Sequence, residues 1–222
     1  MPAGESRQPA FGERELWRFA DRAYWLVHDD LTGALRTSPR VADLTVAAAV
    51  FAELICVEAL TCHRDSFVIE ARPRLVDALG QKLLAAVARR SGPLPAVIND
   101  LAAGLRLQVR QRLLDAGLAE HRRMGWLRRS TVVAPDRYAG PAGAAANLAR
   151  RVASGPPFPV DDLVLLHLLQ QCHTAGNAPS SIPAQVLTAE LHETSDIDPY
   201  RALLRAARAI GRAAQPHPAP AA

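Results

Sequence analysis

The chain has 222 residues, of which 49% are hydrophobic and 22% are charged, values typical of a soluble globular protein. Aromatic residues make up only 5%, whereas Ala and Leu are abundant, and this balance favours helices over strands. Three cysteines without a Cys-x-x-Cys motif exclude a disulfide framework, and a formal net charge of +4 leaves nucleic acid and anionic lipid both open as partners.

The first part of the chain predicts two helices joined by a turn. Apolar residues at helical spacing predict a helix over residues 13–29, and Gly33 supplies the turn that follows. Residues 37–60 are apolar on nearly every side, so we expect them to form the buried central helix, with Ser38 as its cap. Glutamates interrupt this stretch, which is therefore too short and too charged to span a bilayer.

The remaining elements are two hairpins and several amphipathic helices. Alternating residues predict a hairpin around Arg64–Asp65, and a second, basic hairpin turns at Met124-Gly125. Helical spacing predicts helices over residues 74–90, 95–118, 140–153, 160–176, 183–193 and 198–214. We therefore predict a mainly α fold, with a single compact helical domain and one or two small β-hairpins. The expected boundaries are residues 11–213 for the domain, with disordered ends at residues 1–10 and 214–222.

No motif of a familiar enzyme class is present, neither a dinucleotide or nucleotide loop nor a metalloprotease or serine-hydrolase signature. The pairs Cys62–His63 and Cys172–His173 are sequence neighbours whose side chains diverge, so we expect core positions rather than metal ligands. The pairs Asp29–Asp30 and Asp161–Asp162 adjoin turns or helix starts, where carboxylates cap backbone N–H groups. We predict no catalytic residue, no metal and no cofactor.

Arginine is concentrated on the predicted helix 95–118 and the basic hairpin. Arg106 and Arg110 lie one turn apart and share a helix face. The hairpin carries basic residues on both sides of its turn with a tryptophan between them: Arg122, Arg123, Trp126, Arg128 and Arg129. Arginine binds phosphate bidentately and tryptophan favours membrane interfaces, so these hairpin residues are candidates for a membrane-surface patch. A solvated hairpin in an arginine-rich proteome is an equally weighted alternative.

Three segments in a fixed order carry a family resemblance. They are "HDDLTGAL" after the first helix, "AELICVEAL" at the end of the central helix, and "GLRLQVRQRLLDAGLAE" before the basic hairpin. This order resembles the Golgi phosphoprotein 3 family in its shorter bacterial form, from about Glu13 to about Val133 and more weakly to about Arg212. The resemblance implies a compact helical globule that is not an enzyme. Eukaryotic members bind phosphatidylinositol 4-phosphate on membranes and are adaptors for the tails of Golgi glycosyltransferases.

The resemblance also implies a headgroup site, but most of its residues differ in this chain. The expected tryptophan and three arginines fall on Ser38, Ala47, Ala103 and Arg106. Only Arg106 is retained, and Arg36 and Arg40 lie in the same loop as the missing tryptophan, so the candidate phosphate-binding residues are Arg36, Arg40, Arg106 and Arg110. One retained arginine does not build a selective pocket, which needs several converging donors. We therefore expect general affinity for anionic lipid.

The predicted function is a non-enzymatic peripheral membrane-binding or adaptor protein, cytoplasmic and bound to the inner face of the cell membrane. The expected partners are an anionic phospholipid, with a phosphoinositide as the ligand that the resemblance implies, and a protein client. The alternative is a winged-helix nucleic-acid-binding protein, because residues 109–135 fit a recognition helix and wing, although no clear helix-turn precedes them.

Overall fold

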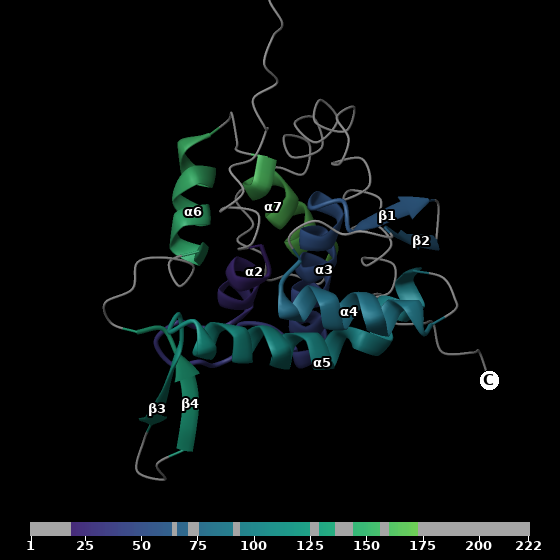
Figure 1. Ribbon diagram of the computed structural model, residues 1–222. Helices are drawn as coiled ribbons and strands as arrows, with labels where there is room; N and C mark the ends of the chain where they lie inside the picture. Colours follow the sequence, from purple (N-terminus) through teal and green to yellow (C-terminus); the bar gives the residue numbers. More distant parts are fainter. Residues whose placement is uncertain are drawn as a thin grey trace, which may run out of the picture.

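The computed structural model describes residues 19–63, 66–70, 76–90, 94–124, 129–135, 144–155 and 160–172. These ranges contain six α-helices and two antiparallel hairpins, which confirms the predicted mainly α fold (Figure 1). The helices are α2 (Phe19–Val27), α3 (Pro39–Cys56), α4 (Ala78–Ala88), α5 (Leu94–Asp115), α6 (Ala144–Ser154) and α7 (Val160–Cys172). The strands are β1 (Leu60–His63), β2 (Ser66–Ile69), β3 (Glu120–Met124) and β4 (Arg129–Val133). Within these ranges, no helix has the length and apolar character that a membrane crossing requires.

Several predictions fall outside the described residues. They are the start of the first helix, the two last helices over residues 183–193 and 198–214, and the disordered ends at residues 1–10 and 214–222. Nothing in the structure tests the predicted domain boundaries.

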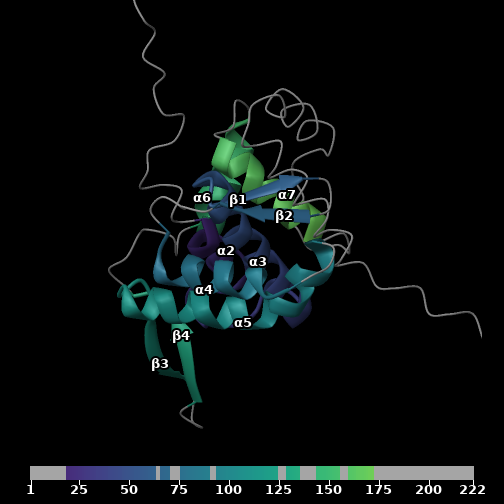
Figure 2. The same cartoon turned by 45° about the vertical axis from the view of Figure 1, so that its right-hand side comes forward.

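Helix α3 is the buried centre of the molecule, as its composition predicts. It is buried along nearly its whole length and packs against α2, α5 and α7. The Ser38 hydroxyl accepts a hydrogen bond from the Val41 N–H at 3.4 Å, so the predicted cap is confirmed. In Figures 1 and 2, α5 lies alongside α4 and crosses close to α3.

The predicted end of the central helix, at residue 60, is wrong by four residues. Helix α3 ends at Cys56 because Glu58 adopts a left-handed conformation with φ of 55°, and the Ala59 N–H donates to the Leu54 carbonyl at 2.8 Å. This is the hydrogen bond of a Schellman-type helix end, which usually has glycine at the left-handed position. With glutamate there, the sequence carries no stop signal, and the apolar run continues directly into β1.

The hairpin of β3 and β4 extends away from the helices, and its base is tied to the turn after α2 (Figures 1 and 2). The Thr131 hydroxyl donates to the Thr32 carbonyl at 3.0 Å, and the Ala134 N–H donates to the Asp30 carbonyl at 2.8 Å. Within the turn, Asp29 Oδ1 accepts hydrogen bonds from the Leu31 and Thr32 N–H groups, so the predicted capping role of Asp29 is confirmed.

A partly buried arginine that was not predicted as a site residue joins four helices. The Arg112 guanidinium, on α5, lies 2.7 Å from Asp21 Oδ1 on α2, 3.0 Å from Glu53 Oε2 on α3 and 3.2 Å from Asp77 Oδ2 at the start of α4. Asp77 also caps α4, since its carboxylate accepts from the Gly80 N–H at 2.7 Å. We call these residues, Asp21, Glu53, Asp77 and Arg112, the Arg112 cluster.

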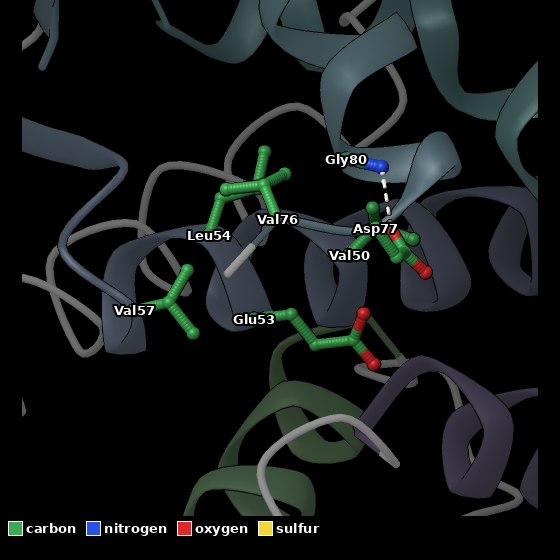
Figure 3. Close-up of a pocket in the computed structure, with 7 residues that line it drawn as sticks. All are labelled: Val50, Glu53, Leu54, Val57, Val76, Asp77 and Gly80. Atoms are coloured by element: carbon green, nitrogen blue, oxygen red, sulfur yellow. Dashed lines mark hydrogen bonds between the residues drawn. The ribbon is translucent and has the colours of Figure 1, made fainter. Parts of the chain in front are cut away.

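Glu53 is one of two buried acids in this cluster, with Asp21. Its carboxylate accepts from the Ala20 N–H at 2.8 Å, and Figure 3 shows it on α3 beside a small cavity that Asp77 also lines. Burial raises the pKa of Glu53 to about 7, and Arg112 only partly opposes this rise. Three ionised carboxylates would carry more negative charge than one guanidinium balances. This excess is consistent with Glu53 retaining a proton near neutral pH.

Gly33, in the turn after α2, has a left-handed φ of +68°. A Cβ at this position would lie 2.3 Å from both Thr131 Oγ1 and the Val132 carbonyl oxygen, so Gly33→Ala adds a clash to the backbone strain. We expect a loss of about 3 kcal/mol in the free energy of unfolding, measured by urea denaturation. Gly117→Ala is the matched control, because Gly117 has φ of +67° and open space around its Cβ, and should cost about 1 kcal/mol. Equal losses would show that the contact with β4 is unimportant.

The second prediction concerns Glu53→Gln and pH. The folded pKa of about 7 lies above the ordinary value of 4.5, so the folded state binds more protons between these values. The contribution of Glu53 to stability is therefore present at low pH and is lost as the pH rises from about 4.5 to about 7. The stability of wild type relative to Glu53→Gln should be about 2–3 kcal/mol higher at pH 5 than at pH 8 in urea unfolding. If the stability difference between wild type and Glu53→Gln does not change with pH, the raised pKa of Glu53 is wrong.

Candidate functional site

Two of the four candidate phosphate-binding arginines contact one histidine, and the charge of a third acts on it. Arg36 Nε donates to the His28 carbonyl at 3.0 Å, and Arg106 Nη1 lies 3.4 Å from His28 Nε2. Arg110 lies one turn beyond Arg106 on α5, and its charge lowers the pKa of His28. Arg40 is exposed at the second residue of α3, one turn before Asp43. We call Arg36, Arg40, Arg106 and Arg110 the arginine surface.

Carboxylates already pair with two of these arginines. Arg36 Nη2 lies 3.1 Å from Asp29 Oδ2 and 3.4 Å from Asp30 Oδ1. Arg106 Nε donates to Asp43 Oδ1 on α3. Arg110 is half-buried and forms no ion pair with a described residue. The arginines therefore differ in how readily they can bind an external anion.

His28 is held between Tyr24 and Arg106. Its ring stacks on Tyr24 with the centroids 4.0 Å apart, and Nδ1 lies 2.8 Å from the Tyr24 carbonyl oxygen. The proton is therefore on Nδ1, where it donates to that carbonyl, and Nε2 is the acceptor for Arg106. The pKa of His28 is lowered to about 4, mainly by burial and in smaller part by the charges of Arg106 and Arg110. The sequence analysis missed both aromatic residues, although their spacing of four on a helix places them on one face.

The other positions implied by the family resemblance do not contribute cations. Ser38 is used as the cap of α3, and Ala47 is fully buried in the core. Ala103 is exposed on α5, one turn before Arg106, but has no polar side chain. Arg106 therefore supplies the only cation among these four positions, and the other charges come from Arg36, Arg40 and Arg110.

The hairpin candidates are only partly described. Arg122 donates to Glu120 Oε1 at 2.8 Å, and Arg123, opposite Ser130, is exposed. Alternation along β3 directs these two side chains to opposite faces. Trp126 and Arg128 lie outside the described residues, as does the side chain of Arg129. Whether the hairpin residues form one patch stays a prediction.

Two exposed apolar side chains lie in the same segments as the arginine surface. Leu107 follows Arg106 on α5 and is 54% exposed, and Leu31 lies on the turn after α2 and is 68% exposed. Arginines beside exposed leucines suit a membrane interface, where the cations meet headgroups and the apolar side chains enter the acyl boundary.

A shallow groove of about 460 Å³ lies on the opposite flank of α5, against α4. Its charged lining residues are Asp77, Lys82, Arg112 and Asp115, two of each sign. The guanidinium of Arg112 is already bonded to three carboxylates. The groove therefore presents little net charge to a ligand, in contrast to the arginine surface.

Among the remaining titratable candidates, Asp162 has a structural role. Asp162 is completely buried and pairs with Arg22 on α2 and with Arg151 on α6, where Oδ2 lies 3.1 Å from Nη1. It therefore joins three helices, a larger role than the predicted cap. His167 is buried in α7, whereas the side chains of Cys62 and His63, the side chain of Cys172 and all of His173 lie outside the description. Among the described residues, no three His, Cys, Asp or Glu side chains are placed to hold a metal ion.

A family model described as Golgi phosphoprotein 3 (GPP34) matches residues 19–212. A search of curated proteins finds no match to the chain.

The structure makes a prediction about His28 itself. Because the folded pKa of about 4 lies below the ordinary 6.5, His28 contributes stability that is lost as the pH falls from about 6.5 to about 4. Long-range ¹⁵N–¹H NMR spectra should show the Nδ1-protonated tautomer at pH 7 and a titration midpoint near 4. A midpoint near 6.5 would contradict the buried position. Between about pH 4 and pH 7 the contribution of His28 to stability grows with pH, whereas that of Glu53 falls. The stability of the wild type alone therefore does not separate the two contributions.

Proposed function

Because the chain belongs to the Golgi phosphoprotein 3 family, we propose that it is a non-enzymatic peripheral protein that binds anionic phospholipid membranes through the arginine surface. The observation that carries the proposal is that Arg36 and Arg106 both contact His28, while Arg110 lies one helical turn beyond Arg106 and its charge acts on the same residue. A phosphate group near His28 would meet guanidinium donors from the turn after α2 and from α5. His28 adds no charge there at neutral pH, so the attraction comes from the arginines.

General attraction to anionic lipid fits this surface better than selection of one headgroup. Each arginine close to an anionic membrane contributes up to about 1 kcal/mol, and salt screens this attraction. Ala47 and Ala103 occupy positions where the family resemblance implies arginines, so fewer donors converge than a selective pocket requires. Leu31 and Leu107, which are exposed in the same chain segments as these arginines, would add apolar contact with the membrane.

The family also supports two finer parts of the proposal. A cytoplasmic location on the inner face of the cell membrane would place the arginine surface against anionic lipid. A protein client, as adaptors of the family carry, would then bind to a part of the molecule that faces away from the bilayer. Neither the membrane location nor the protein client requires an enzymatic site.

The test is sedimentation of the protein with vesicles that are neutral, rich in phosphatidylserine or supplemented with phosphatidylinositol 4-phosphate. Binding to phosphatidylserine vesicles should fall with added salt and persist in the presence of duplex DNA. The Arg106→Gln/Arg110→Gln variant should bind these vesicles at least about tenfold more weakly, since it loses two surface cations.

The matched control is Arg89→Gln/Arg90→Gln, which removes the same charge from the exposed end of α4. It should change binding by less than about threefold. Equal losses in the two variants would mean that overall charge attracts the protein and that the arginine surface has no special role. Tight DNA binding without vesicle binding would favour the nucleic-acid alternative.

A further inference from the structure

Two sides of the Arg106 guanidinium already contact residues of this chain. Its Nε–H donates to Asp43, and Nη1 lies 3.4 Å from the neutral Nε2 of His28. A guanidinium has five N–H donors, and a carboxylate and a phosphate accept from the same ones. Asp43 therefore occupies an edge of Arg106 that a phosphate oxygen would also use.

Asp43 has no other hydrogen bond to a described residue. Asp29 is different, because it pairs with Arg36 and also caps the turn through the Leu31 and Thr32 N–H groups. The side chains of Asp43 and Arg106 are 16% and 21% exposed, so solvent screens their ion pair less than a fully exposed one. Removing the charge of Asp43 therefore alters the arginine surface without removing a turn or a cap.

We infer that Asp43 competes with lipid phosphate for Arg106 and thereby limits the affinity of the arginine surface for anionic membranes. This inference rests on the proposed function, whose surface it concerns. In the unbound protein, Asp43 holds the Arg106 side chain toward α3. When a phosphate binds, Arg106 exchanges the carboxylate for a phosphate oxygen, while His28 still accepts from Nη1. Arg110, which pairs with no described carboxylate, is available for the first contact.

The variant that tests this is Asp43→Asn, assayed on phosphatidylserine vesicles at fixed salt. Its affinity should exceed that of wild type by about threefold to tenfold, because both the competing bond and a negative charge are lost. Glu58→Gln is the matched control, since it makes the same change of charge at an exposed residue beyond the opposite end of α3. It should raise affinity by less than about twofold.

A double variant separates competition from charge. In the Arg106→Gln background, Asp43→Asn should raise vesicle affinity no more than Glu58→Gln does, because the bond to be released is absent. Asp43→Ser provides the same comparison if the asparagine variant melts at a lower temperature than wild type. An Asp43→Asn effect that persists undiminished in the Arg106→Gln background would overturn the inference.

Titration with inorganic phosphate separates the inference from the proposed function. The ¹⁵N–¹H signal of Arg106 Nε should shift at lower phosphate concentrations in Asp43→Asn than in wild type or Glu58→Gln. If it does so while no variant binds vesicles, the competition stands and the membrane function fails. If Asp43→Asn and Glu58→Gln respond alike to phosphate, the competition is wrong whatever the vesicles show.

Discussion

The bonds of Arg112 to Asp21, Glu53 and Asp77 are the constraint on which the arrangement of helices depends. They bring together side chains from α2, α3, α5 and the start of α4, from positions 35 to 91 residues apart in the sequence. Breaking a buried ion pair by removing one partner typically costs about 3–5 kcal/mol, because the other charge stays buried. A shift or rotation of α5 would leave carboxylates of three other helices without their cation, so these bonds fix α5 in place.

The orientation of α5 also determines which side chains lie on the flank away from Arg112. Residues 106 and 110 are roughly 40° apart around the helix axis, whereas residue 112 lies roughly 120° from residue 106, across the buried face. With Arg112 directed toward the carboxylates, Arg106 is directed toward His28, just before the turn after α2, and Arg110 lies one helical turn further along the same flank. The turn after α2 is itself held by β4, through hydrogen bonds of Thr131 and Ala134. The arginine surface is thus a consequence of core ion pairing on one side and of hairpin docking on the other.

The sequence was sufficient for features that depend on local patterns. Apolar residues around the whole of α3 indicated its burial, and the positions of Ser38, Gly33 and Asp29 indicated a cap and a turn. It was insufficient where a residue departs from the usual preference or where partners are distant. Glu58 ends α3 in a conformation that normally calls for glycine. Arg112 looks like one more arginine on a basic helix, because its three partners lie on other elements and only the fold identifies them.

Ion pairs inside the molecule limit what its net charge says about binding. Many of the described arginines are used inside the molecule: Arg22 and Arg151 with Asp162, Arg36 with Asp29 and Asp30, Arg106 with Asp43, and Arg122 with Glu120. In the formal net charge of +4, the charges of each such pair cancel. The net charge does not show which arginines are held tightly by their partners. A cation bound by a completely buried carboxylate such as Asp162 offers little to an external phosphate, whereas one bound by a carboxylate that reaches solvent, such as Asp43, can exchange partners. The capacity of this protein to bind an anion is therefore set by the partners of individual arginines more than by their number.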